Sequence, residues 1–115
     1  MTSSSFQVVS VIGAGAWGTA LAHLLATKGF NIRLWAHEPE VMKAIQNSRE
    51  NSWYLPGVML PNSIQATNSL ADAVQNTDLV VLAVPSHSMS TVISNLRPLL
   101  RQVIPITIAT KGIEE

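Results

Sequence analysis

The stretch Gln7-Val-Val-Ser-Val-Ile-Gly-Ala-Gly-Ala-Trp-Gly18 decides the fold of this chain. Its first half, Gln7 to Ile12, is a short β-branched run that suits a strand covered on both faces. Its second half is a G-x-G-x-x-G turn, after which Trp17 to Lys28 places apolar residues at helical spacing, up to Gly29. The stretch therefore predicts a strand, a tight turn and a helix in direct succession.

The glycines of this turn point to a ligand that carries phosphates. Gly13 permits the tight turn, Gly15 lets the backbone approach a pyrophosphate, and Gly18 lets the helix pack close to the sheet. The start of the helix offers free N–H groups and a partial positive charge to the same phosphates. We therefore expect dinucleotide binding rather than a merely structural turn. For Trp17, packing on a neighbouring loop and direct contact with the cofactor both stay open.

The rest of the chain alternates strands and helices. We expect strands over Asn31 to Trp35, Ile64 to Thr67, Leu79 to Val84 and Ile104 to Thr110, and helices from Pro39, over Ser69 to Asn76, and over Ser88 to Leu100 with a break near Pro98. Asn51 to Pro61 lacks both periodicities and is typical of a long ordered loop that serves a site. This order predicts one α/β domain over residues 1–115, a Rossmann-type doubly wound parallel sheet of about five strands. Ligands bind such sheets at the carboxyl ends of the strands.

The residues after the second strand, Ala36-His37-Glu38, are the place to look for contacts with an adenosine ribose. Glu38 follows Gly18 by 20 positions, close to the spacing of a carboxylate that binds the ribose 2′-hydroxyl, but it could equally cap the next helix. His37 is better placed to face the ribose. With Arg33 nearby it could accommodate a 2′-phosphate, although Arg33 lies within the strand and could point away. These residues favour NADP, with use of NAD left open.

The ends of the fourth and fifth strands offer further candidates. After the fourth strand, Ser86 or Ser88 is expected to cap the next helix rather than to act in catalysis, and His87, which has no evident carboxylate partner, is expected to have a loop role. After the fifth strand, Lys111 stands where the nicotinamide would lie. It could hold an anionic substrate or polarise its oxygen, and the alternative is a solvated lysine.

The composition excludes several classes of function. Seven basic residues balance seven acidic ones among 115, so there is no basic field for nucleic acid. There is no cysteine, and no His, Asp and Glu cluster has metal-ligand spacing, so we expect no disulfide and no metal. No apolar run reaches the length of a membrane span and no secretion signal is evident, which predicts no membrane insertion and a cytoplasmic protein. Only 12% of residues are charged, which suggests that a partner covers part of the surface.

Taken together, these pieces resemble the N-terminal domain of bacterial-type NAD(P)-dependent glycerol-3-phosphate dehydrogenase. The matching stretches are Gly13-Ala-Gly-Ala-Trp-Gly-Thr-Ala-Leu-Ala22, Asn51-Ser-Trp-Tyr-Leu-Pro-Gly57, Val84-Pro-Ser-His87 and Ala109-Thr-Lys-Gly112. The glycine motif alone would fit many dehydrogenases. The Tyr-Leu-Pro loop and the Ala-Thr-Lys-Gly strand end make the resemblance specific.

This resemblance implies reversible hydride transfer between C2 of sn-glycerol 3-phosphate and NAD(P), with dihydroxyacetone phosphate as the product, in glycerophospholipid synthesis. It implies that the cofactor contacts are Gly13, Gly15, Ala16, Trp17, Gly18, His37, Tyr54 and Lys111. Lys111 would touch both cofactor and substrate. The family's full-length protein is expected to be a homodimer.

The family continues into a second, helical substrate domain, which holds its general-base lysine, and this chain stops at Glu115. We therefore expect the chain to bind cofactor weakly and to lack turnover, because hydride transfer needs a closed, oriented site. Two alternatives remain. A 6-phosphogluconate or ketopantoate type dehydrogenase would not be expected to show the loop from Asn51 to Gly57, and a nucleotide-sensing domain without catalysis would have no need of Lys111.

Overall fold

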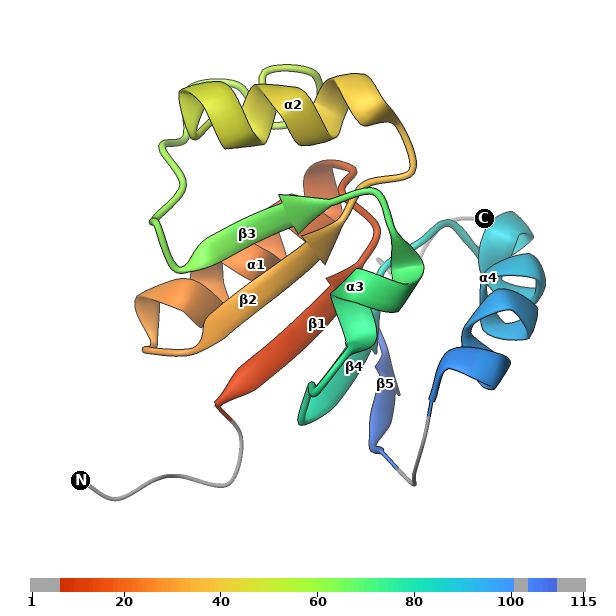
Figure 1. Ribbon diagram of the computed structural model, residues 1–115. Coiled ribbons are helices and arrows are strands. Elements are labelled where there is room, and N and C mark those ends of the chain that lie inside the picture. The colour runs from red at the N-terminus through yellow and green to blue at the C-terminus, as the bar shows by residue number, and fades with distance from the viewer. Residues whose placement is uncertain (1–6, 101–103, 110–115) are drawn as a thin grey trace.

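The computed structural model describes residues 7–100 and 104–109. Its strands are β1 (Val8–Ile12), β2 (Asn31–Trp35), β3 (Ile64–Thr67), β4 (Leu79–Leu82) and β5 (Ile106–Ile108). They form one parallel sheet in the order β3-β2-β1-β4-β5 (Figure 1). The helices are α1 (Ala16–Thr27), α2 (Pro39–Ser48), α3 (Leu70–Val74) and α4 (Met89–Leu96), with short 3-10 helices η1 (Ser86–Ser88) and η2 (Arg97–Leu99).

The centre of the sheet is β1, which pairs with β2 on one side and with β4 on the other. From β1 the chain moves outward through β2 to β3, and after α3 it returns to the other side of β1 to form β4 and β5. The strand order therefore reverses between β1 and β4. At such a switch point the loops that follow the two strands diverge and leave a crevice for a ligand.

Helices cover both faces of the sheet (Figure 1). On one face, α1 and α2 enclose a core that includes Val9, Val11, Ala22, Leu34, Val41 and Ile45. On the other, α3 and α4 enclose a core that includes Ile12, Val74, Val80, Leu82, Val92 and Leu96. Side chains of β1 enter both cores, which is why its sequence is apolar at nearly every position. The predicted doubly wound α/β fold is confirmed.

Two predicted strands are longer than the strands observed. β4 stops at Leu82 rather than at Val84. β5 spans Ile106–Ile108 rather than Ile104 to Thr110, the last residue of which lies outside the described part of the chain. Pro105 has no amide hydrogen, so it takes part in the pairing only through its carbonyl, which accepts a hydrogen bond from β4 at 3.0 Å.

The helix predicted over Ser88 to Leu100, with a break near Pro98, is observed as α4 followed by η2, so the predicted break is confirmed. Pro98 cannot donate an amide hydrogen, and the α-helical pattern gives way to 3-10 geometry next to it. The helix expected from Ser69 is observed as α3, and the Ser69 hydroxyl caps it by accepting from the amide of Asp72 at 3.2 Å. Within residues 7–100 and 104–109, no helix is long and apolar enough to cross a membrane.

Candidate functional site

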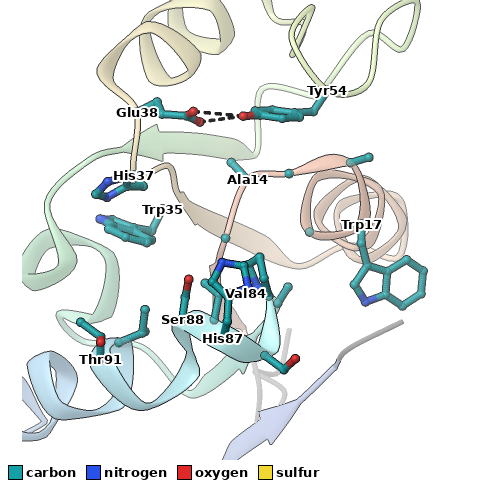
Figure 2. Close-up of a pocket in the computed structure, with 18 of the residues that line it drawn as sticks. Ala14, Trp17, Trp35, His37, Glu38, Tyr54, Val84, His87, Ser88 and Thr91 are labelled. Carbon is teal, nitrogen blue, oxygen red and sulfur yellow. Dashed lines mark hydrogen bonds between the residues drawn. The ribbon is translucent and has the colours of Figure 1, made fainter. Parts of the chain in front are cut away.

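A cleft of about 990 Å³ opens at the carboxyl ends of β1, β2 and β4 (Figure 2). Its walls come from the glycine turn (residues 13–18), the end of β2, Tyr54 of the following loop, residues 83–88 after β4, and one side of α4. Of the predicted site residues, the cleft brings together Gly13, Gly15, Ala16, Trp17, Gly18, His37 and Tyr54. Lys111 lies outside the described residues.

The glycine turn packs backbone directly on backbone. Gly13 has a φ of +123°, which residues with side chains rarely adopt, and its amide donates to the Trp35 carbonyl at 3.1 Å. A Cβ atom added at Gly13 would lie 2.8 Å from the carbonyl oxygen of Ala83. One added at Gly18 would lie 1.7 Å from the carbonyl oxygen of Gly13. These two positions exclude a side chain, so the start of α1 can lie against the ends of β1 and β4.

Gly15 differs from the other two glycines. Its φ of −74° and ψ of −169° are extended values that any residue adopts, and no atom of residues 7–100 and 104–109 lies within 4 Å of a Cβ added there. A side chain at Gly15 would instead fill the cleft that this residue lines. The amides of Ala16, Trp17 and Gly18 open α1 and have no acceptor within the helix. Open space over a glycine beside free N–H groups fits the diphosphate of a dinucleotide.

Trp17 connects the glycine turn to the end of β5, the strand at one edge of the sheet. Its indole Nε1 donates to the carbonyl oxygen of Ala109, directly after β5, at 2.6 Å. The ring is 38% exposed, and it points away from His37 and Tyr54 (Figure 2). Trp17 thus packs on a strand end rather than on a loop, and its contact with the cofactor stays a prediction. The side chain still lines one end of the cleft.

At the opposite end of the cleft, two rings at the end of β2, those of Trp35 and His37, lie next to each other. The Trp35 ring is buried, and the exposed imidazole of His37 lies above it with 5.8 Å between ring centroids. The buried Trp35 ring thus supports the His37 imidazole, which lines the cleft. Arg33 does not join it, because its guanidinium donates to the carbonyl of Gln75 and lines a separate depression. Of the basic residues predicted for a 2′-phosphate, only His37 reaches the cleft.

Glu38 faces Tyr54 across the cleft rather than capping α2. Its backbone occupies the N-cap position, but its carboxylate makes no capping hydrogen bond. The Tyr54 hydroxyl donates to that carboxylate and lies 3.0 and 3.1 Å from its two oxygens. The Glu38 carboxylate accepts this bond and repels a phenolate, so it raises the pKa of the Tyr54 hydroxyl, and partial burial adds to the rise. The hydroxyl is therefore protonated at neutral pH.

Asn51 fixes the loop that carries Tyr54, and the sequence analysis gave this side chain no role. It is fully buried, and its Nδ2 donates to the Ala14 carbonyl at 2.9 Å and to the Thr19 hydroxyl at 2.8 Å. Its Oδ1 accepts from the Tyr54 amide at 3.1 Å. One side chain thus joins the glycine turn, α1 and the loop. The only sequence signal was the place of Asn51 at the head of the Tyr-Leu-Pro stretch.

The residues after β4 line the cleft without an evident chemical role. Of the two serines expected to cap the next helix, Ser88 occupies the N-cap position of α4, but its side chain makes no capping hydrogen bond. The tight 3-10 turn over these residues places Ser88 itself at the start of α4. His87 is exposed, as its expected loop role requires. Among the residues that the structure describes, no group of three or more His, Asp and Glu could hold a metal ion.

Residues 8–115 match the family described as NAD-dependent glycerol-3-phosphate dehydrogenase N-terminus. The glycerol-3-phosphate dehydrogenase (NAD(P)+) of Syntrophobacter fumaroxidans is 46% identical to this chain over 106 residues, which cover 92% of the chain and 31% of that protein. The chain therefore spans about a third of the length of this curated relative.

Solved structures with the same fold include two glycerol-3-phosphate dehydrogenases. The crystal structure of the Coxiella burnetii protein superposes with a TM-score of 0.89 and 33% identity, over 96% of this chain and 34% of that one. The structure of the Saccharomyces cerevisiae protein gives a TM-score of 0.83 and 28% identity, over 96% of this chain and 35% of that one. In each case the similarity covers nearly all of this chain.

Proposed function

Because this chain belongs to the family of the NAD-dependent glycerol-3-phosphate dehydrogenase N-terminus, we propose that its cleft binds NAD or NADP for the oxidation of sn-glycerol 3-phosphate and for the reverse reaction. The relatives are about three times as long as this chain. We therefore assign the reaction to a protein of that length, with residues 1–115 as its cofactor-binding domain. The substrates are small molecules, sn-glycerol 3-phosphate and dihydroxyacetone phosphate.

When bound, NAD(P)+ would supply the hydride acceptor for C2 of sn-glycerol 3-phosphate, and the proton of the C2 hydroxyl would pass to the general-base lysine expected in the second domain of the longer protein. The contribution of this chain is to bind and to orient. The open backbone at Gly15 and the amides at the start of α1 would hold the diphosphate. His37 would face the adenosine ribose and Tyr54 would line its side of the cleft. We propose Lys111, after β5, as the contact with both nicotinamide and substrate.

Within this proposal NADP is favoured over NAD. The exposed His37 imidazole stands above Trp35 and can donate hydrogen bonds to a 2′-phosphate. The neighbouring carboxylate of Glu38 is engaged by Tyr54 and so does not occupy the place beside the imidazole. A carboxylate free to accept from the ribose 2′-hydroxyl would favour NAD instead.

The observation that carries the proposal is the contrast at the glycine turn, where only Gly15 has open space above it. Calorimetric titration of the chain with NADPH, NADH and ADP-ribose tests it. We expect Gly15→Val to weaken binding of all three about tenfold or more, the equivalent of one or two lost charge-assisted hydrogen bonds. Its melting temperature should stay close to that of the unmodified chain, because a Cβ added at Gly15 has no atom of the described residues within 4 Å.

The matched control is Thr27→Val, which places the same side chain at the far end of α1 and should leave binding unchanged. Two results would overturn the proposed site. One is a folded chain that binds none of the three compounds. The other is Gly15→Val binding them as tightly as the unmodified chain.

A nucleotide-sensing domain without catalysis is the competing function for the same cleft. We propose instead that a protein of the relatives' length acts as a cytoplasmic homodimer in glycerophospholipid synthesis. Oxidation of NADPH that depends on dihydroxyacetone phosphate, and that falls in Lys111→Ala, would support the dehydrogenase. Cofactor binding by that longer protein without turnover would favour the sensor. Residues 1–115 alone are expected to bind cofactor without turnover.

A further inference from the structure

Glu38 and Tyr54 meet across the edge of the cleft although they come from different segments. The Tyr54 hydroxyl reaches both oxygens of the Glu38 carboxylate, at 3.0 and 3.1 Å, and both side chains are exposed to the cleft. Figure 2 shows the two side chains spanning the upper edge of the cleft, with His37 on the same side as Glu38. This Glu38–Tyr54 pair therefore stands next to the proposed position of the adenosine ribose.

The two partners are held in place by different parts of the fold. Glu38 follows the end of β2 by three residues and occupies the N-cap position of α2, where its carbonyl accepts from the amides of Val41 and Met42. Tyr54 is set by Asn51, which is fully buried and accepts a hydrogen bond from the Tyr54 amide at 3.1 Å. The ordinary pKa of a tyrosine, about 10, keeps the Tyr54 hydroxyl a hydrogen-bond donor at neutral pH, and Glu38 raises that pKa further. The carboxylate is thus directed toward the loop.

A carboxylate at the end of β2 can act on the ribose in two ways. It can accept a hydrogen bond from the 2′-hydroxyl of NAD, and it repels the 2′-phosphate of NADP. We propose that Tyr54 sets cofactor selectivity by holding the Glu38 carboxylate toward the loop, which leaves the 2′ position beside His37 open to a phosphate. Tyr54 is then a positioning residue for Glu38. This inference rests on the proposed NAD(P) site.

Tyr54→Phe removes the hydroxyl and leaves the ring, so it should release the Glu38 carboxylate toward the ribose. We expect the ratio of NADPH affinity to NADH affinity to fall by about three- to fivefold, the size of an interaction between exposed charges. Glu38→Gln removes the repelling charge, so the same ratio should rise by a similar factor. In the Glu38→Gln background, Tyr54→Phe should no longer change the ratio, because no carboxylate remains to be positioned.

The test is calorimetric titration of the chain and these three variants with NADPH and NADH. Trp53→Phe and Glu40→Gln are the matched controls, because they make similar changes at exposed neighbours that do not line the cleft, and they should leave the ratio unchanged. Raising the salt concentration should shrink both shifts, since screening weakens exposed charges.

Four results would overturn the inference. If Tyr54→Phe weakens both cofactors equally, Tyr54 acts as a direct contact. If it shifts the ratio in the Glu38→Gln background as well, the effect does not pass through Glu38. If the unmodified chain binds both cofactors and neither variant changes the ratio, selectivity lies elsewhere and the proposed site survives. A folded chain that binds neither cofactor would remove the site and the inference together.

Discussion

The two sides of the cleft are built in opposite ways. The side formed by the glycine turn is made by backbone, because Gly13 and Gly18 bring α1 against the strands where no side chain fits. The other side is made by side chains, with Asn51 buried beneath the loop and the Glu38–Tyr54 pair exposed above it. A backbone-built surface has one shape. A surface built from exposed hydrogen-bonding side chains can change its contacts through a single substitution.

This difference fits the parts of a dinucleotide that each side would meet. The diphosphate is common to NAD and NADP, and it is suited by the backbone amides that follow Gly15 at the start of α1. The 2′ position of the adenosine ribose is where the two cofactors differ, and the adjustable side faces that end through His37 and Glu38. We therefore expect side chains added at Gly13 or Gly18 to destabilise the fold on the backbone-built side, and substitutions on the side-chain-built side to change individual contacts at a smaller cost.

The largest effect is expected at Gly18, on the backbone-built side. In Gly18→Ala the new methyl would lie 1.7 Å from the Gly13 carbonyl oxygen, so α1 must move away from the sheet. We expect the free energy of unfolding to fall by about 3 kcal/mol or more, as for strong overpacking. Denaturant titration followed by circular dichroism measures it.

Gly15→Ala is the matched control, because it adds the same methyl where no atom lies within 4 Å. It should change the free energy of unfolding by less than about 0.5 kcal/mol. If the two substitutions lowered the free energy of unfolding equally, the turn would not differ between Gly18, where a Cβ meets backbone, and Gly15, where it does not.

The backbone-built side is also the side that the sequence predicted best. The order of a β-branched run, a glycine motif and an apolar helix is local, so residues 7 to 28 alone specify the strand, the turn and the helix. Alternation along the chain then predicted the parallel sheet. The predictions that failed locally are the ends of β4 and β5, and at β5 the reason is Pro105, whose missing amide removes a donor from the strand pairing.

A smaller loss is expected at Asn51, on the side-chain-built side. Asn51→Leu keeps a similar volume but leaves the Ala14 carbonyl, the Thr19 hydroxyl and the Tyr54 amide without their buried partner. We expect the free energy of unfolding to fall by about 2 kcal/mol, the cost of unpaired buried polar groups. Denaturant titration checks this value. Asn62→Leu, at an exposed turn residue, should cost much less, and a similar loss at both sites would argue against the buried network.

The side-chain-built side resisted prediction because its partners are distant in sequence. Asn51 bonds to residues 37 and 32 positions away, and no periodicity reports such a pairing. Glu38 was assigned to a ribose or to a cap, since both are local expectations, whereas its partner Tyr54 stands 16 positions further on. At Ser88 the local expectation of a cap gave the right position, the N-cap of α4, but not the side-chain hydrogen bond.

The smallest effect is a shift in the titration of Tyr54, the sole tyrosine of the sequence. Glu38 accepts its hydrogen bond and repels its phenolate, so the pKa of Tyr54 in the folded chain lies above the ordinary value of about 10. A pKa raised by folding means that the pair stabilises the fold below about pH 10 and ceases to do so as pH rises through the pKa of Tyr54. Near-ultraviolet absorbance of the phenolate reports the midpoint.

In Glu38→Gln both the acceptor charge and the repulsion are gone, so the midpoint should move down toward about 10. Glu40→Gln removes a charge of the same sign from the first turn of α2 without touching Tyr54, and its midpoint should stay with that of the unmodified chain. Circular dichroism at each pH confirms that the chain is folded where the midpoint is read. If Tyr54 titrates with the same midpoint in Glu38→Gln as in the unmodified chain, the Glu38–Tyr54 pair does not persist in solution. The loop side of the cleft would then be held by Asn51 alone, and the adjustability assigned to that side would have no residue to act through.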